Sequence, residues 1–482
     1  MRRSRSFALS VIGFTFMIAL TGCSSGNSNG GGGGGGSNPP PVISSAQPPA
    51  GTAGVAYPAF TFTATGGTPP LTWSESGALP EGMFFSNSGV LSGTPSGGGS
   101  FAFTVMVQDS AGRNATPLDC ALQISGPAQG LNMETPRTSH TATLLTTGSV
   151  LVAGGEDNDH NALASAELFD PNASTFTPTG SMATARGGHT ATPLNTGSVL
   201  VAGGLNGNTV LASAELFDPS SGSFSPAGSL NTARFDHTAT SLQDGRVLVT
   251  GGDDAGDDSL ASAELFDPVA GTFTAINSMN VARTQHTATL LQSGNVLITG
   301  GSDSLGNALN SAEIFDPVGG TFTLTNNLNS VRSGHTATLL PDNTVLVAGG
   351  TDDQGGTLAS AEIFDPSAGT FTPTGNMTAA RFHDTATLLG DGTVLFAGGS
   401  HLVLAQCGDN CEAFVPVSLG STEIFTPATG TFSPASGMES ERADHTATLL
   451  GSGHVLVTGG VFARLLSRRY ISGVLSSAEI LQ

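Results

Sequence analysis

One pattern of apolar and polar positions recurs along most of the chain. Its clearest copy reads HTATLLPDNTVLVAGG at 335–350, where short apolar stretches alternate with polar residues and end at a glycine pair. Such alternation predicts β-strands, and no run shows the spacing of an amphipathic helix. The glycine pairs are 48 or 49 residues apart, except for a last step of 61, and lie at 154–155, 203–204, 251–252, 300–301, 349–350, 398–399 and 459–460.

Each copy supplies four expected strands, read in the fifth copy as HTATLL, VLVAGG, AEIFDP and GTFTPTG. A repeat of about 50 residues with this content is typical of a propeller blade. The first three strand types occur seven times. The fourth occurs six times, around Phe176, Phe224, Phe273, Phe322, Phe371 and Phe432. Residues 127–133 align with the stretch that follows this strand in later copies, so we expect them to complete the last blade and close the ring.

The four segments resemble the kelch repeat of bacterial proteins with a galactose-oxidase-like central domain. Phe replaces the usual Trp of the fourth strand, as at Phe371. The resemblance implies one blade per copy. The expected fold is therefore all-β, with a seven-bladed kelch-type propeller over 127–482.

Residues 42–126 form a separate expected β domain. PAFTFTATGG and SFAFTVMVQDS alternate apolar and polar residues, and Trp73, the only tryptophan, would anchor a sandwich core. The segment resembles Ig-like, cadherin-like modules of bacteria. Relatives of cadherins often bind calcium through clustered acids, whereas this segment offers only Asp109, Glu75 and Glu81.

The chain begins with a basic and then apolar stretch, 1–22, which predicts a signal peptide. Its end, Leu20-Thr21-Gly22-Cys23, resembles the bacterial lipobox, which implies a lipid on Cys23 and a new N-terminus there. Plain secretion with cleavage after Ala19 or Gly22 is the alternative. No Asp follows Cys23, which by the same resemblance favours the outer membrane. Residues 23–41 are a Gly-rich tether.

Net charge limits the kinds of partner, and the basic residues and cysteines limit the chemistry that the chain can perform. The formal net charge is −22, and removal of the leader with three arginines would make it −25, which disfavours nucleic acid. All 15 basic residues are Arg, so lysine chemistry is excluded. Cys407 and Cys411 predict a local disulfide, with a redox or metal site as the alternative. Cys120 is expected to be a buried apolar residue.

Three polar positions repeat with the blades. Each copy opens with an arginine, followed three residues later by a histidine, except in the sixth copy, which has Asp384. A glutamate recurs in each third strand. Because every blade has these residues, we expect a structural role, with Arg–Glu pairs and histidine hydrogen bonds to the backbone.

The repetition breaks in two long loops, at 400–421 and 461–477. The first carries the cysteine pair, and the second carries basic and apolar residues. Aromatic and arginine side chains are common at interfaces. We therefore expect ligand contacts at Phe414, Phe462, Arg464, Arg468, Arg469 and Tyr470. The alternative is that these loops pack on each other or on the Ig-like domain.

Three functions fit the sequence. The first is a non-enzymatic, monomeric surface lipoprotein that binds a protein or a glycan, for example in adhesion. The second is a carbohydrate-active enzyme, but the copper site implied by the galactose-oxidase resemblance needs tyrosines, and the chain has only Tyr57 and Tyr470. The third is a calcium-binding structural protein. Its metal candidates, which a carboxylate hydrolase would also use, are Asp253, Asp254, Asp257, Asp258, Asp352 and Asp353.

Overall fold

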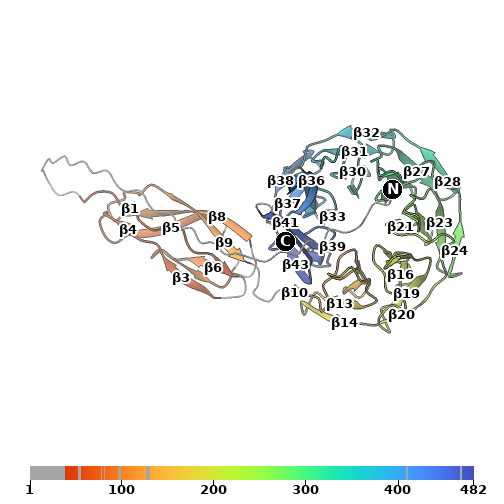
Figure 1. Ribbon diagram of the computed structural model, residues 1–482. Coiled ribbons are helices and arrows are strands. Elements are labelled where there is room, and N and C mark those ends of the chain that lie inside the picture. Colours follow the sequence, from red (N-terminus) through yellow and green to blue (C-terminus); the bar gives the residue numbers. More distant parts are fainter. Residues whose placement is uncertain are drawn as a thin grey trace.

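The computed structural model describes residues 38–52, 56–77, 79–80, 82–95, 99–125, 131–408, 411–466 and 469–481. In these ranges the secondary structure is β-strand, with no helix long and apolar enough to span a membrane. The leader, Cys23 and nearly all of the tether lie outside the described residues. Figure 1 shows a disc of radiating sheets with a smaller sandwich beside it. The all-β expectation is confirmed.

The sandwich consists of two main sheets and one short pair. The sheets are ordered β2-β9-β8-β5 and β3-β7-β6, with β1 paired to β4. Their bounds are β1 Val42–Ile43, β2 Gly51–Thr52, β3 Tyr57–Thr61, β4 Ala64–Thr65, β5 Thr72–Gly77, β6 Met83–Phe85, β7 Val90–Gly93, β8 Gly99–Gln108 and β9 Leu118–Ser125. Trp73 is 6% exposed in the core, and Cys120 is a buried free thiol, as the sequence predicts.

In the part of the chain that the structure describes, the array forms seven four-stranded antiparallel sheets. The innermost strands are β11 Thr141–Leu144, β15 Thr190–Pro193, β21 Thr238–Ser241, β25 Thr287–Leu290, β29 Thr336–Leu339, β33 Thr385–Leu388 and β39 Thr446–Leu449. The second strands are β12 Val150–Ala153, β16 Val199–Ala202, β22 Val247–Thr250, β26 Val296–Thr299, β30 Val345–Ala348, β34 Val394–Ala397 and β40 Val455–Thr458.

The third strands are β13 Ala166–Asp170, β19 Ala214–Asp218, β23 Ala263–Asp267, β27 Ala312–Asp316, β31 Ala361–Asp365, β37 Thr422–Thr426 and β43 Ser477–Leu481. The outer strands are β14 Thr175–Pro178, β20 Ser223–Pro226, β24 Thr272–Ala275, β28 Thr321–Leu324, β32 Thr370–Pro373, β38 Thr431–Pro434 and β10 Leu131–Asn132. Each innermost strand contacts the next one round the ring, and β39 contacts β11.

The second strands show why the blades stack. All four residues of β30 are buried, because each blade packs between two neighbours and therefore has two covered faces. Towards the rim, Phe364 and Phe371 pair across β31 and β32 with ring centroids 4.7 Å apart. Phenylalanine therefore fills the position where the kelch pattern usually has tryptophan.

The glycine pair after each second strand is required by close packing. Gly349 has φ +71°, and a Cβ there would lie 2.6 Å from the carbonyl oxygen of Arg381 in the next blade. Any larger residue would separate the blades at this point.

The seventh sheet takes its outer strand from the beginning of the array. Leu131 pairs with Ala478 and Asn132 with Ser477, and Met133 is buried beside them. The first and last segments of the array thus share one sheet, which leaves the ring without an open seam.

The two long loops expected from the sequence are instead β-hairpins. The first hairpin is β35–β36, Ser400–Gly408 with Cys411–Ser418, and the second is β41–β42, Val461–Leu466 with Arg469–Val474. A shorter hairpin, β17–β18, pairs Leu205–Asn206 with Thr209–Val210. The alternation in HLVLAQC and EAFVPVS is itself a strand pattern, so treating these segments as loops was wrong.

Candidate functional site

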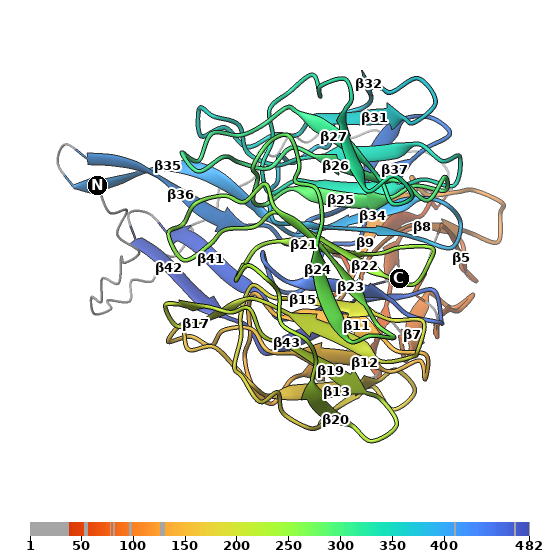
Figure 2. The ribbon, with the colours of Figure 1, turned by 90° about the vertical axis from the view of Figure 1, so that its right-hand side faces the viewer.

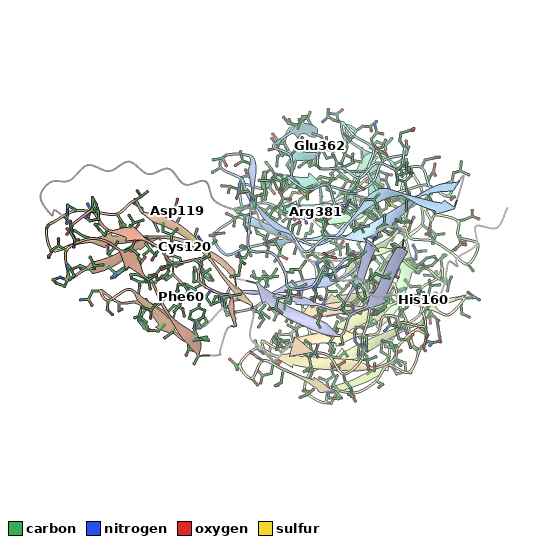
Figure 3. The ribbon with its side chains drawn as sticks, turned by 60° about the vertical axis from the view of Figure 1, so that its left-hand side comes forward. Phe60, Asp119, Cys120, His160, Glu362 and Arg381 are labelled. Carbon is green, nitrogen blue, oxygen red and sulfur yellow. The ribbon has the colours of Figure 1, made fainter. Side chains whose placement is uncertain are left out.

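The repeated arginines and glutamates form buried pairs, as expected. In all seven copies an Arg Nη2 lies 2.6 to 3.0 Å from a Glu Oε1, and the arginine side chains are fully buried. Each guanidinium also donates to the first glycine carbonyl of the pair, as from Arg332 to Gly349 at 2.7 Å. Figure 3 labels Glu362 and Arg381 of two adjacent blades inside the disc, and Phe60 and Cys120 in the sandwich.

Each glutamate also holds the chain that enters its blade. Glu362 accepts backbone N–H groups from Asn329 and Ser330 at 2.8 and 3.2 Å. Burial alone would raise the pKa of Glu362, but the Asn329 N–H and the Arg332 guanidinium outweigh it and hold that pKa below its usual range. The Arg–Glu pairs therefore connect chain segments within each blade and are not available to a ligand.

The repeated histidines bond to threonine hydroxyls, which corrects the expected backbone bonds. The Nε2 atom of each lies 3.0 to 3.1 Å from a threonine Oγ1 of the preceding blade. Burial first, and then the nearby arginine, lowers the pKa of His335 to about 3. These rings are thus neutral and occupied between blades, so they do not form a metal ring.

A ring of variable residues around the axis was not predicted from the sequence. The residue before each repeated histidine, or before Asp384 in the sixth copy, has φ between 50° and 62° and is at least partly exposed; the seven are Ser139, Gly188, Asp236, Gln285, Gly334, His383 and Asp444. Backbone N–H groups link successive members, as from His383 to the Gly334 carbonyl at 3.0 Å. The sequence carries no clear signal for it, because both residues between the constant arginine and the histidine vary from copy to copy.

Two charged members of this ring, His383 and Asp444, form an ion pair. His383 Nδ1 lies 2.8 Å from Asp444 Oδ1 in the next blade. Burial alone would lower the pKa of His383, but the Asp444 carboxylate, with smaller contributions from Asp236 and Asp384, outweighs it and raises the pKa to about 9. The axis therefore has a fixed imidazolium–carboxylate pair on the side of the sixth and seventh blades.

The two hairpins stand next to each other. Figure 2 shows β35–β36 and β41–β42 projecting together from one side of the disc. Strand β36 lies against β41, and Ser418 Oγ donates to the Val461 carbonyl at 3.1 Å. The first hairpin is also held by the fifth blade, through Leu402 N–H and Thr357 Oγ1 at 2.9 Å. The second is held by the first blade, through Val474 N–H and Asn158 Oδ1 at 2.7 Å.

Apolar side chains remain exposed on these hairpins. Leu404 and Phe414 are opposite one another in the register of β35–β36, and each is 54% exposed. Tyr470 is 40% exposed on β42, opposite Leu465. The hairpins thus pack together at their base, as one alternative foresaw, and still present three large apolar groups to solvent.

The remaining predicted hairpin residues have different positions. Phe462 is only partly exposed, and its ring lies over Gly473 on the paired strand. Arg464 is paired with Glu441 at 2.6 Å, so its charge is balanced. Arg468, and the side chains of Arg469, Cys407 and Cys411, lie outside the described residues.

The acidic loops use their carboxylates to hold turns. Asp254 and Asp352 each accept backbone N–H groups two and four residues later. Asp353 accepts the Ala308 N–H of the neighbouring blade at 2.5 Å, and Asp253 accepts the Ser259 hydroxyl at 3.0 Å. Across the described ranges, no three His, Cys, Asp or Glu side chains gather as a metal site, so the metal candidates, Asp257 and Asp258 included, do not converge.

In the sandwich, Asp109 likewise uses its carboxylate to hold a turn. Asp109 accepts N–H groups from Thr68, Ala111 and Arg113 and forms an ion pair with the Arg113 guanidinium at 2.7 Å. Its oxygens therefore organise a turn of the domain.

Family models match segments in both parts of the chain. The family described as "Putative Ig domain" matches residues 40–124. The family described as "Kelch motif" matches residues 186–231, 234–280, 283–329 and 332–378. No curated protein matches the chain.

Solved structures share the fold. One is described as "Novel fungal alcohol oxidase with catalytic diversity among the AA5 family, in complex with copper". It has 18% sequence identity and a TM-score of 0.55, over 72% of this chain and 76% of that chain. At this identity the likeness concerns the propeller fold alone.

Proposed function

We propose that this kelch-motif propeller, with its N-terminal Ig-like domain, is a binding protein that contacts a surface protein or a glycan through its two hairpins. The observation that carries the proposal is the exposed set Leu404, Phe414 and Tyr470 on hairpins that break the repeat. Exposed aromatic and aliphatic groups on a rigid support can bind without a large ordering cost. The hydrogen bonds to the first and fifth blades supply that support.

The proposed location is the bacterial outer membrane or cell surface. A lipid on Cys23 would anchor the chain, and the Gly-rich tether would hold the folded domains away from the bilayer. A net charge of −22 supports a partner other than nucleic acid. We expect the protein to act as a monomer, because the ring closes on itself.

The proposed role is non-enzymatic and requires no cofactor. Tyr57 is buried in the sandwich, where its hydroxyl donates to the Pro49 carbonyl at 2.7 Å, and Tyr470 is on a hairpin of the propeller. The chain has two tyrosines in total, so tyrosine ligands of the galactose-oxidase type have no counterpart in the disc core. Calcium remains a candidate only as a structural ion of the acidic loops.

The test compares two soluble forms of residues 42–482. One is intact, and the other has 402–416 and 463–472 each replaced by Asn-Gly, which joins the paired residues His401 and Val417, and Phe462 and Gly473. Both are exposed to surface extract of the source organism and to a glycan array. A partner held by the intact form and lost by the trimmed form supports the hairpin site. Equal binding would place the function on the disc or the Ig-like domain.

A further inference from the structure

The interface between the fifth and sixth blades departs from the other six. In those six, an imidazole from one blade reaches a threonine hydroxyl of the blade before it, and its Cε1 packs on the glycine pair. A Cβ on the first glycine would lie 2.6 to 2.8 Å from that Cε1 at Gly154, Gly203, Gly251, Gly300, Gly398 and Gly459. Each of these six interfaces is therefore filled by one imidazole ring.

The sixth blade has Asp384 in place of the histidine, and two changes follow. No imidazole lies near the equivalent glycine, Gly349. A Cβ placed there would have the Arg381 carbonyl oxygen as its nearest neighbour and Met377 Cε next, at 3.3 Å. Thr336, which would receive the imidazole, turns instead to the Ala348 carbonyl at 3.4 Å. The aspartate side chain has two fewer non-hydrogen atoms than the histidine side chain, which frees a volume of about one water molecule.

Asp384 is also electrically unbalanced. The residue is 8% exposed, and within the described chain neither carboxylate oxygen accepts a hydrogen bond from another residue. The two cations nearest in sequence are committed elsewhere, Arg381 to Glu423 at 2.7 Å and His383 to Asp444 at 2.8 Å. A buried carboxylate without a partner is costly, so it must either hold a proton or acquire a cation. Burial raises the pKa of Asp384 to about 7, despite the opposing Arg381 charge.

We propose that this interface is a site for one small monovalent cation of the size of Na⁺, bound by the Asp384 carboxylate beside the Thr336 hydroxyl. Replacement of an imidazole by a carboxylate leaves oxygen ligands, which hard cations prefer. A single carboxylate favours a single positive charge, and among the described residues no group of three His, Cys, Asp or Glu side chains gathers there. The ion would take the place of the imidazole in joining the two blades.

The test measures thermal unfolding of the soluble 42–482 protein at pH 8.5, where the Asp384 carboxylate is ionised. NaCl is compared with tetramethylammonium chloride at equal ionic strength, since the larger cation cannot enter. The wild-type Tm is expected to be several degrees higher in NaCl and to saturate with concentration. D384N should lose this response, and D384H should lose it while keeping a high Tm, because it restores the repeated contact.

The control variant is D342N, an exposed turn acid that accepts the Thr344 N–H at 3.0 Å. It should keep the sodium response of the wild type. A second readout, ²³Na NMR line broadening, should be seen with wild type at pH 8.5 and lost with D384H or at pH 5. Equal responses of wild type and D384H would mean a general salt effect and would overturn the site. A wild-type Tm that depends on pH but not on sodium would show that Asp384 binds only a proton, which also overturns it.

Discussion

Each arginine at the start of a copy is fully buried and paired with a glutamate, so its removal should leave a buried carboxylate without a counter-charge. Arg332→Met leaves Glu362 without its cation, and we expect a loss of about 3–5 kcal/mol in unfolding free energy. The lowered pKa of Glu362 fixes the pH dependence: its stabilisation is present above its ordinary value of 4.5 and is lost as the pH falls through the lowered pKa. The difference between wild type and variant should therefore shrink in acid.

A matched control for that variant is Arg246→Met. Arg246 pairs with Asp244 at 2.6 Å, but both side chains are more than a third exposed. Solvent screens such a pair, so its loss should cost less than about 1 kcal/mol. Denaturant unfolding of both variants measures the contrast, and equal costs would show that the buried Arg–Glu pair is not what holds the blades.

The axial ion pair gives a second prediction. Asp444→Asn should lower the pKa of His383 from about 9 towards its ordinary 6.5, because burial would then act with less opposition. NMR titration of the ring protons measures this directly, with His335 as an internal reference that stays neutral down to about pH 3. A His383 pKa that does not move would contradict the pairing.

The sign of the stability effect follows from the same pair. Because the pKa of His383 is raised, protonation of this histidine stabilises the fold fully below pH 6.5, and this stabilisation is lost as the pH rises through about 9. Because the pKa of Asp444 is lowered, its carboxylate stabilises the fold above pH 3.8, and this stabilisation is lost as the pH falls through the lowered pKa. The variant should thus be weakest relative to wild type between about pH 4 and 6.5.

Sequence reasoning at the residue scale succeeded where one need recurs in every blade. The Arg–Glu pairs were predictable because both residues repeat together. The histidine partners were not, because Thr141 and its equivalents belong to the preceding blade and only the three-dimensional stacking brings them close. His383 was missed for the opposite reason, since a residue that occurs once at a varying position carries no pattern.

At the element scale the hairpins are the main departure from repetition. Their strands are readable in the alternation of apolar and polar residues at 400–418, whereas the length of the two insertions favours loops. The glycine pairs, by contrast, fixed the ends of the second strands correctly, because close blade packing allows no side chain there.

The hairpins also carry a prediction about binding. Leu404→Ser and Phe414→Ser remove exposed apolar area and should each weaken partner binding by about five- to thirtyfold, since truncation of an interface anchor costs about 1–2 kcal/mol. Val269→Ser and Val318→Ser are matched controls, because these valines are 94% and 96% exposed on turns of other blades. Titration by surface plasmon resonance compares the four variants, and equal weakening by the controls would refute a hairpin site.

For the whole molecule, the closing strand is the structural feature that joins the two ends of the array. A chain starting at 137 lacks β10 and the buried Met133, which leaves the outer edge of β43 unpaired. We expect a lower Tm and association through that edge, compared with a chain starting at 38. Calorimetry and size-exclusion chromatography measure both, and an unchanged monomeric Tm would show that β10 is dispensable.

The most informative single measurement is hydrogen exchange of the 42–482 protein with and without its captured partner. If the hairpins form the binding site, protection should be gained at 400–418 and 461–474, with the rim turns and the sandwich unchanged. Protection confined to the rim, to the acidic loops or to the Ig-like domain would contradict binding through the hairpins.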